Sequence, residues 1–405
     1  MAASRITHVA GHFRTTASSG GTPSPEETYR VPGSLRCVTC RAVALPAHGP
    51  DEGRMHPRRI ALVGLGLAAR TIHLPALRKL RDVDIVGGYD PANSIPGVRS
   101  FPTLAALLEK GRPDIVTIAT PPSSHLEIAI AALAAGAHIF CEKPLVTDLA
   151  EADLLVAAAR AARRVVGINS EFPHMAIHAA ARDEIGSARF GRLLFVDVRQ
   201  SFVVTPATEL GWRGDDPQRS FKEFGTHVID LCKAFFGERP LAMRARMPRP
   251  FAGRGPDYLN LVQLEFSEDR VAQITLDRLT RGKHSYLDIR LVGENGTIET
   301  SLGGRAELTL GLRPQGRKPF GDVDFALGGR ARLYHGDHHV TIARSPLDLF
   351  ADATANLYRC FLDAIAEGRE PPNGLDEARH TLGMLYDCYA LADGARARVP
   401  AAPSC

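Results

Sequence analysis

Short apolar segments that alternate with helix-patterned segments restrict the fold of this sequence more than any other feature. The expected strands are Ile60–Val63, Val83–Tyr89, Asp114–Ala119, His138–Cys141 and Val165–Asn169. The helices expected between them are Arg70–Leu80, Leu104–Lys110, Leu126–Ala135 and Asp148–Ala162. Asp148 is expected to cap the last helix, and Gly136 to end the one before it. Such alternation is typical of βαβ units, so we predict an α/β fold that begins with a doubly wound parallel sheet.

Longer strand-like segments follow Gly191 without long helices between them. They cover Leu193–Val203, Tyr258–Phe266, Val271–Leu276 and Tyr286–Val292. A run of strands of this kind predicts a large, mostly antiparallel open sheet in a C-terminal α+β domain. Three helices are expected to pack on that sheet, over Glu223–Phe236, Leu347–Glu367 and Asp376–Ala392.

The chain of 405 residues is long enough for two buried cores. Residues 1–56 are rich in Gly, Pro, Ser, Thr and Arg and show no apolar period, so we expect a disordered leader there. The first domain is expected over residues 57–178 and the second, which would bind substrate and form subunit contacts, over residues 179–399.

Composition excludes several classes of function. A chain with 44% hydrophobic and 23% charged residues is globular, and no segment approaches the roughly 20 apolar residues that span a membrane. The net charge of +4 comes without a basic block beside aromatic residues, so no nucleic-acid partner is expected. Seven scattered cysteines indicate free thiols and a cytoplasmic location. Cys37 and Cys40 form one CxxC pair without further ligands nearby, so no metal site is expected.

The turn after the first strand carries the clearest chemical signal. Its sequence, Gly64-Leu65-Gly66-Leu67-Ala68-Ala69, fits the pattern G-x-G-x-x-A. Glycines at these places permit a tight turn and let a pyrophosphate approach the N-terminus of the following helix. A glycine pair alone is weak, because many structural turns contain one. In this context we expect Gly64, Gly66, Leu67 and Ala68 to bind a dinucleotide.

Asp90 ends the second strand, 24 residues beyond Gly66. A carboxylate there can accept hydrogen bonds from the adenosine ribose hydroxyls, although Asp90-Pro91 is also an ordinary way to start a turn. Because an acidic group repels a 2′-phosphate, NAD is favoured over NADP. Arg99, the nearest arginine, leaves NADP possible. Strand pattern, glycine loop and Asp90 together predict a Rossmann domain that binds a nicotinamide dinucleotide.

Further motifs line up along most of the chain. They are His73-Leu74-Pro75-Ala76-Leu77, Thr120-Pro121-Pro122-Ser123-Ser124-His125, Glu142-Lys143-Pro144, Gly225-Thr226-His227 with Asp230, and Gly293–Thr297. With these, the sequence from about Arg58 to Val399 resembles the glucose-fructose oxidoreductase, inositol dehydrogenase and rhizopine-catabolism (Gfo/Idh/MocA) family. Glu-Lys-Pro at a strand end is the most diagnostic motif. The resemblance implies an oxidoreductase that acts on a sugar, inositol or related polyol.

Lys143 lies at the carboxyl end of a parallel strand, where open sheets bind ligands. The resemblance places this lysine beside both nicotinamide and substrate, where its charge favours the alkoxide that forms as hydride leaves. The alternative is a surface lysine with its head in water.

Several cofactor contacts also follow from the resemblance. It implies that the loops after the third and fourth strands contact the cofactor through Thr120, Pro121, His125, Glu142 and Lys143. The alternative for the first of these loops is a helix start capped by Ser123 or Ser124. Arg213, beside Trp212, resembles another cofactor or substrate contact, and the alternative for Trp212 is core packing.

A single histidine is more often structural, but the resemblance makes His227 the candidate general acid and base, because oxidising an alcohol requires removal of the hydroxyl proton. Glu223 lies four residues earlier, on the same helical face, where its carboxylate can orient the substrate or the imidazole. The family typically has Asp at the position of Glu223, and it commonly has arginine where Ser170 or Glu171 stands. The substrate pose is therefore expected to differ from the usual one.

The leading hypothesis is an NAD(P)-dependent dehydrogenase that uses Lys143, His227 and Glu223 on a small-molecule sugar or polyol. One alternative is a non-catalytic regulatory member that binds dinucleotide without turnover. Another keeps the fold but acts on double bonds or nucleotide-linked sugars, or eliminates a glycosidic group. A homodimer or homotetramer is expected, because an open sheet commonly buries its exposed face between subunits.

Overall fold

The computed structural model describes residues 57–203, 218–249, 257–281, 286–302, 305–311, 320–326, 328–336, 338–345 and 347–394. The predicted leader, the Cys37 and Cys40 pair, and the expected contacts Trp212 and Arg213 lie outside these residues. Within them, no helix combines the length and the apolar character needed to cross a membrane.

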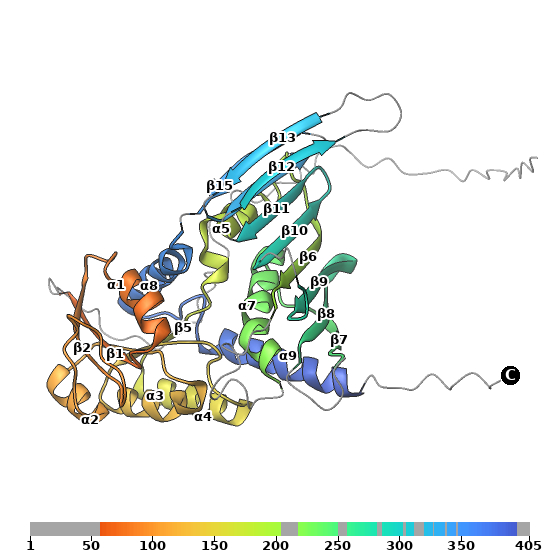
Figure 1. Cartoon of the computed structure of the whole chain (residues 1–405). Helices are drawn as coiled ribbons and strands as arrows, with labels where there is room; N and C mark the ends of the chain where they lie inside the picture. Colours follow the sequence, from red (N-terminus) through yellow and green to blue (C-terminus); the bar gives the residue numbers. More distant parts are fainter. Residues whose placement is uncertain are drawn as a thin grey trace, which may run out of the picture. The chain divides into compact units, whose positions relative to one another are not determined.

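A five-stranded parallel sheet forms the first part of the fold, in the order β2-β1-β3-β4-β5 (Figure 1). Its strands are β1 (Arg58–Val63), β2 (Val83–Tyr89), β3 (Ile115–Ile118), β4 (His138–Cys141) and β5 (Val166–Ile168). The predicted parallel sheet is thus confirmed. From β1 the chain first continues to β2 on one side and then crosses back to β3 on the other side of β1. The direction in which strands are added to the sheet therefore reverses between β1 and β3. Ligands bind at the carboxyl ends of strands beside such a switch point.

The helices around this sheet follow the predicted positions. They are η1 (Ala69–His73), α1 (Leu74–Leu77), α2 (Leu104–Ala106), η2 (Leu107–Gly111), η3 (Pro122–Ser124), α3 (His125–Ala134) and α4 (Leu149–Ala162). Asp148 caps α4, because its side chain accepts a hydrogen bond from the Glu151 amide at 2.8 Å. Gly136 follows α3 with a φ of +84°, a left-handed conformation that ends the helix.

The first sheet has a hydrophobic core on each face, because successive strand side chains point to opposite sides. Ala61 and Val63 pack with α3 and α4, whereas Ile60 and Leu62 pack with α1 and with α8 (Leu349–Glu367). The fourth strand contributes to both cores in the same alternating way.

Helix α8 corrects one expectation. It was expected to pack on the second sheet, but only its first turns, through Leu349 and Ala353, join that core. Farther along, Tyr358 and Phe361 pack on Phe140 of β4, with ring centres 4.0 and 5.4 Å away. In Figure 1 the helix lies beside α1. Helical periodicity identifies an apolar face but not the sheet that this face will cover.

An eight-stranded sheet forms the second part, in the order β15-β14-β11-β10-β6-β9-β8-β7. Its strands are β6 (Leu193–Ser201), β7 (Ala242–Arg246), β8 (Leu259–Phe266), β9 (Arg270–Asp277), β10 (Leu287–Gly293), β11 (Thr297–Leu302), β14 (Arg330–His335) and β15 (His338–Arg344). β6 and β9 are parallel and the other neighbours are antiparallel. The predicted, mostly antiparallel sheet is confirmed. A separate pair, β12 (Arg305–Gly311) and β13 (Phe320–Ala326), was not expected.

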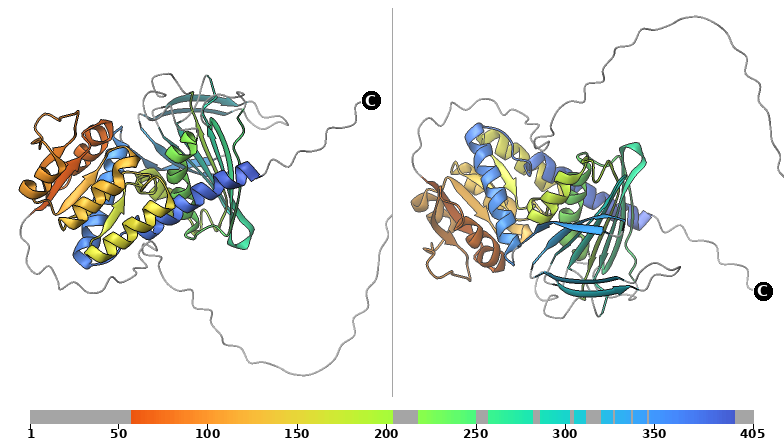
Figure 2. Two further views of the ribbon diagram at one scale, coloured as in Figure 1. Left: turned by 90° about the horizontal axis from the view of Figure 1, so that it is seen from below. Right: turned by 90° about the horizontal axis from the view of Figure 1, so that it is seen from above.

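Among the residues that the structure describes, three longer helices and two short 3₁₀ turns complete the fold. These elements are η4 (Phe172–His174), α5 (Ala176–Glu184), α7 (Arg219–Phe236), η6 (Ser267–Asp269) and α9 (Leu375–Gly394). Helix α7 packs on β6, β8 and β9. Helix α9 contacts α4 and β5 of the first part as well as α7 and β7 of the second, and Figure 2 shows it running between them. The two sheets are therefore held together by helices α8 and α9.

Candidate active site

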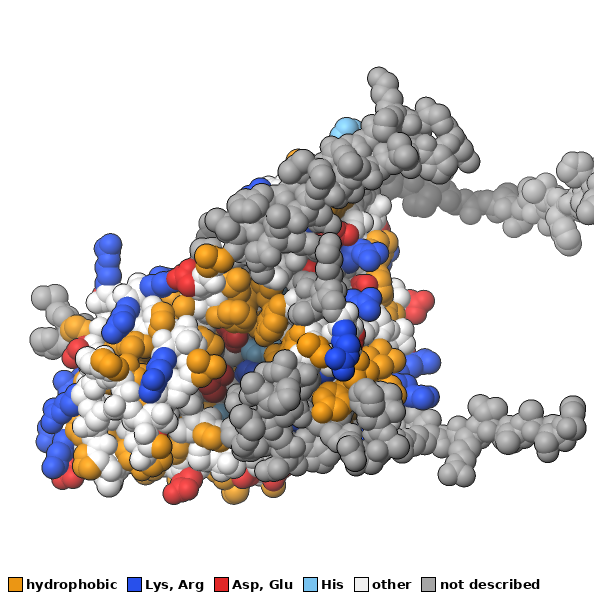
Figure 3. Space-filling model, viewed as in Figure 1, with side chains coloured by type: hydrophobic (Ala, Val, Ile, Leu, Met, Phe, Trp, Pro, Cys, Tyr) orange, Lys and Arg blue, Asp and Glu red, His pale blue; other side chains and the backbone are white. Residues whose placement is uncertain are grey.

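The predicted binding residues gather where the parallel strands end. Gly64 follows β1, Asp90 follows β2, Thr120 comes two residues after β3, and Glu142 follows β4. Figure 3 shows hydrophobic, acidic and histidine side chains at the centre of this face, where the surface is hollowed. The strand ends therefore supply the walls of a site, as the switch-point topology requires.

The two glycines of the first loop have different roles. Gly64 has a φ of +87°, and a Cβ atom there would lie 2.5 Å from the Ala119 carbonyl oxygen, so this position requires glycine. Gly66 has open space around the place of a Cβ atom. That opening fits the close approach of a pyrophosphate. Leu67 is 77% exposed and extends from the same loop.

Asp90 holds the glycine loop and starts a turn at the same time. Its Oδ2 accepts a hydrogen bond from the Leu65 amide at 2.8 Å, and its Oδ1 accepts from the amides of Ala92 and Asn93 at 2.8 and 2.7 Å. Partial burial alone would raise the pKa of Asp90, but these hydrogen bonds outweigh it and lower the pKa. The interpretation of Asp90 as a turn starter is therefore confirmed, whereas its contact with a ribose stays a prediction. The Arg99 guanidinium lies over the Phe101 ring, 4.6 Å from its centre.

The loop after β3 does not use a side-chain cap at the start of α3. Ser124 stands at the cap position without a capping hydrogen bond, so the capping alternative is wrong for this residue. Its hydroxyl instead donates to Thr120 Oγ1 at 2.8 Å and also lies 2.9 Å from the Pro121 carbonyl oxygen. The serine thereby fixes the Thr120–Pro121 segment at the strand end.

His125 lies inside the protein with no exposed surface. Its Nε2 is 2.9 Å from the Thr120 carbonyl oxygen, and its Nδ1 is 3.1 Å from those of Pro144 and Leu145. Burial lowers the pKa of this histidine, although the surrounding carbonyl groups act in the opposite direction. His125 thus joins the loops after β3 and β4, and it can act on a cofactor only through their positions.

Glu142 ends a buried chain of polar side chains. Its Oε1 accepts a hydrogen bond from Asn169 Nδ2 at 2.8 Å and lies 2.9 Å from His73 Nε2. Tyr358 Oη lies 3.0 Å from His73 Nδ1 and 2.8 Å from Thr117 Oγ1. Burial alone would raise the pKa of Glu142, but the contact with His73 holds it low, at about 2. The carboxylate is therefore ionised and fixed at the end of β4.

Lys143 connects the end of β4 to helix α7. Its Nζ donates to the Glu223 carbonyl oxygen at 2.8 Å and lies 5.8 Å from the centre of the Phe224 ring. The predicted catalytic lysine and the helix that carries Glu223 and His227 therefore meet at one place.

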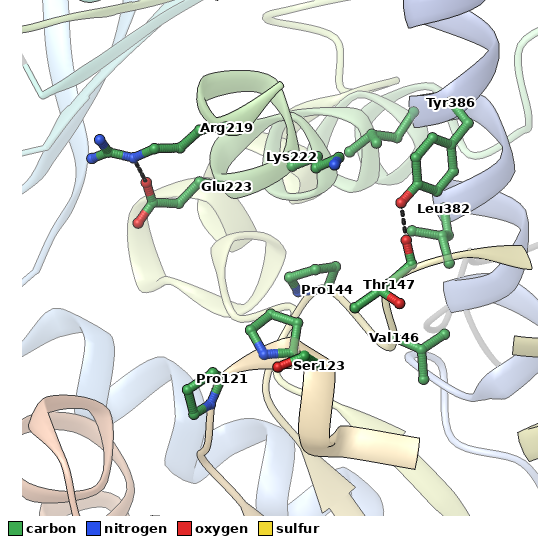
Figure 4. Close-up of a pocket in the computed structure, with 12 residues that line it drawn as sticks. Pro121, Ser123, Pro144, Val146, Thr147, Arg219, Lys222, Glu223, Leu382 and Tyr386 are labelled. Atoms are coloured by element: carbon green, nitrogen blue, oxygen red, sulfur yellow. Dashed lines mark hydrogen bonds and ion pairs between the residues drawn. The ribbon is translucent and has the colours of Figure 1, made fainter. Parts of the chain in front are cut away.

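His227 is buried against Phe172, with parallel rings whose centres are 4.2 Å apart. Burial lowers its pKa well below the ordinary range, helped by the charge of Lys143. The Glu223 carboxylate pairs with Arg219 at 3.5 Å on the same helix, as the dashed line in Figure 4 marks. The carboxylate that faces His227 comes from Glu171, whose Oε2 lies 3.7 Å from Nδ1.

Two anchors of α7 were not recognised as such from the sequence. Asp230 accepts hydrogen bonds from Ser170 and Thr381, each at 2.5 Å, and so ties α7 to the end of β5 and to α9. Asp257 accepts from the Ser220 and Phe221 amides at 2.7 and 3.0 Å, and so caps the start of α7. Asp230 stood in a recognised motif, but Asp257 lies more than 35 residues from the amides it caps and left no local signal.

A cavity of about 230 Å³ lies beside these groups (Figure 4). It is lined by Pro121, Pro122, Ser123, Pro144, Val146, Thr147, Arg219, Lys222, Glu223, Leu382, Leu385 and Tyr386. Glu223 is part of its wall, whereas Lys143 and His227 are not. The wall is mostly apolar, with the charged residues contributed by α7.

Family models match both parts of the chain. Residues 58–170 match the Gfo/Idh/MocA model for an oxidoreductase family with an NAD-binding Rossmann fold, and residues 178–299 match the Gfo/Idh/MocA C-terminal domain. Both matches agree with the sequence resemblance.

Individual relatives agree with the family models. The chain is 38% identical to 1,5-anhydro-D-fructose reductase of Ensifer adhaerens over 30% of its own length and 35% of that protein. It spans less than two thirds of several other curated relatives. With inositol 2-dehydrogenase of Acidothermus cellulolyticus it is 26% identical over 70% of its own length and 79% of the relative.

A solved structure shares the fold. It is an inositol dehydrogenase homolog from Azotobacter vinelandii in complex with NAD⁺, with a TM-score of 0.64 and 22% identity. The match covers 84% of this chain and 96% of that one.

Proposed function

The chain belongs to the Gfo/Idh/MocA oxidoreductase family, and on this basis we propose that it is an NAD-dependent dehydrogenase or reductase. The proposed substrate is a sugar, inositol or related polyol, in which a secondary alcohol and a ketone are interconverted. One contact carries the proposal: Lys143 Nζ lies 2.8 Å from the Glu223 carbonyl, which joins the strand-end lysine to the helix of His227.

The proposed chemistry needs a proton acceptor and a positive charge at the same oxygen. Bound NAD supplies the hydride acceptor. His227 would take the hydroxyl proton during oxidation and return it during reduction. The Lys143 ammonium would stabilise the negative charge that develops on the oxygen. Glu223, in the wall of the adjacent cavity, would hold a further hydroxyl of the substrate.

We propose that the strand-end loops hold the cofactor. The open space at Gly66 supports a pyrophosphate site in the first loop, because a side chain there would occupy the approach. The proposed contacts are Gly64, Gly66, Leu67, Ala68, Asp90, Thr120, Pro121, Glu142, Lys143 and Arg213. His125 would act by positioning the two loops it joins. The ionised Asp90 favours NAD over NADP, because a 2′-phosphate beside it would be repelled.

A substrate screen tests the proposal. Sugars, inositols and sugar acids are offered with NAD and with NADP, and the absorbance of the reduced nicotinamide is followed. We expect turnover with NAD for at least one polyol, and a loss of about 100- to 10,000-fold in Lys143→Ala and His227→Ala. Lys110→Ala, a change at an exposed lysine of η2, is the matched control. Tight NAD binding without turnover of any compound would favour the regulatory alternative.

Two further properties belong to this proposal. We expect a cytoplasmic enzyme, because Cys141, Cys232 and Cys388, which are buried within the described residues, are free thiols. We also expect a homodimer or homotetramer. Light scattering of the purified chain measures its mass in solution, and a monomer at micromolar concentration would contradict the expected assembly.

A further inference from the structure

Two polar atoms of the candidate site face each other without a hydrogen bond. Glu171 Oε2 and His227 Nδ1 are 3.7 Å apart, and both side chains are at least 95% buried. Among the described residues, neither atom has a hydrogen-bond partner. Glu171 follows β5 and His227 lies on α7, so the pair spans the two elements that meet at the site.

The carboxylates of the neighbouring Glu142 and Glu223 already contact other side chains. Glu142 contacts His73 and Asn169, and Glu223 contacts Arg219. A buried carboxyl group and a buried imidazole are costly to leave without partners, so such groups mark positions where a proton or a ligand completes the arrangement. A contraction of less than 1 Å from the observed 3.7 Å would bring the two atoms to hydrogen-bond distance.

We propose that Glu171 is a positioning residue for His227, and that the number of protons on the Glu171–His227 pair decides which ring nitrogen is free. This inference rests on the proposed function. When the pair carries one proton, Nδ1–H donates to the Glu171 carboxylate and Nε2 is free to accept the substrate hydroxyl proton. The Nδ1 proton then passes to Glu171, the hydride would leave the same carbinol carbon for NAD, and a carbonyl would form. When the pair carries two protons, the Glu171 carboxyl donates to Nδ1 and Nε2–H can protonate an alkoxide.

The surroundings favour a protonated Glu171 at neutral pH. Burial and the negative charge of Glu142 together raise the pKa of Glu171 to about 8, although the positive charge of Lys143 acts in the opposite direction. The same two charges act on His227, which burial keeps neutral. Tyr286 also interacts with Glu171 and stays protonated because burial raises its pKa. The carboxyl group and the neutral imidazole are thus matched as donor and acceptor.

Nuclear magnetic resonance of isotope-labelled histidine in the full chain tests the pair without requiring turnover. The His227 signals are assigned by their loss in His227→Gln, and their chemical shifts report which ring nitrogen carries the proton. In the wild type we expect His227 to change from Nε2–H to Nδ1–H as the pH rises through about 8. In Glu171→Gln the side chain no longer titrates, so we expect the proton to stay on one and the same ring nitrogen of His227 throughout that range.

Two further variants keep the outcome decisive. Glu171→Asp keeps an ionisable group, and we expect the change between ring nitrogens to persist, even if Glu171→Gln does not fold. Glu223→Gln, the same change at the carboxylate that pairs with Arg219, is expected to leave the behaviour of His227 as in the wild type. An identical pattern in the wild type and Glu171→Gln would overturn the inference, as would a wild-type His227 without a change of tautomer. A failure of the substrate screen alone would instead count against the proposed function.

Discussion

At the scale of single residues, the two glycines of the first loop can be compared by the same substitution. Gly64→Ala places a Cβ atom 2.5 Å from a backbone oxygen at a φ of +87°, so we expect a loss of about 2 kcal/mol or more in unfolding free energy. Gly66→Ala meets open space, so stability should change by less than about 1 kcal/mol while NAD binding weakens by at least about 10-fold.

Thermal unfolding and calorimetric titration with NAD separate the two effects. Equal losses of stability in both variants would contradict the distinct roles that the loop geometry gives to these glycines.

Glu142 predicts how stability depends on pH. Its pKa falls from an ordinary value of 4.5 to about 2 in the folded protein, so the folded state favours the ionised form. This contribution is fully present above pH 4.5 and is lost as the pH falls toward about 2. In Glu142→Gln, we expect the melting temperature to fall less steeply with acid over that range than in the wild type.

The control is Glu109→Gln, a change at an exposed glutamate of η2. If Glu142→Gln kept the full acid dependence of the wild type, the buried link to His73 would not favour the carboxylate.

At the scale of elements, helix α7 depends on a distant cap. Asp257 accepts hydrogen bonds from the Ser220 and Phe221 amides and, at 2.8 Å, from Tyr389 Oη. Asp257→Ala should cost about 1–3 kcal/mol in unfolding free energy, because buried amides lose their partners. Since α7 carries His227, kcat should fall together with stability.

Urea unfolding and turnover at a saturating polyol concentration measure these two effects. Asp352→Ala, which removes an acidic residue from the first turn of α8, is the comparison, because its carboxylate is exposed and pairs with Lys79. Its cost should be below about 1 kcal/mol. If Asp257→Ala lowered neither the unfolding free energy nor kcat, the long-range cap would not hold the helix.

At the scale of the whole molecule, the strands of the parallel sheet could be predicted from the sequence, and so could the edge at which we expect the site. The alternation of apolar and helix-patterned segments identified β1 to β5. The carboxyl ends of parallel strands lie at the same edge of a sheet, and ligands bind there. The neighbour of His227 could not be predicted in this way. Helical spacing favoured Glu223, but the facing carboxyl belongs to Glu171, from another element. Contacts of this kind depend on tertiary packing, which local periodicity does not encode.

Local periodicity also could not predict which sheet α8 covers, and this packing bears on the expected domain boundary. We predict that residues 57–178 alone do not unfold cooperatively, because α8 buries Tyr358 and Phe361 against the first sheet. Each such side chain contributes roughly 1.5–3 kcal/mol when buried. Residues 57–394 should melt in one transition. Calorimetry of both fragments tests this, and a sharp transition in the shorter one near that of the longer would contradict it.

In the proposed reaction, a hydride moves between a polyol carbon and nicotinamide beside Lys143 and His227. The most direct measurement uses polyols and sugars deuterated at their carbinol carbons, incubated with the full chain and NAD, with the nicotinamide then analysed by mass spectrometry. We expect deuterium in the reduced nicotinamide with at least one compound, and at least about 100-fold less of it with His227→Ala. Tightly bound NAD that stays oxidised and unlabelled with every compound would contradict the proposed reaction.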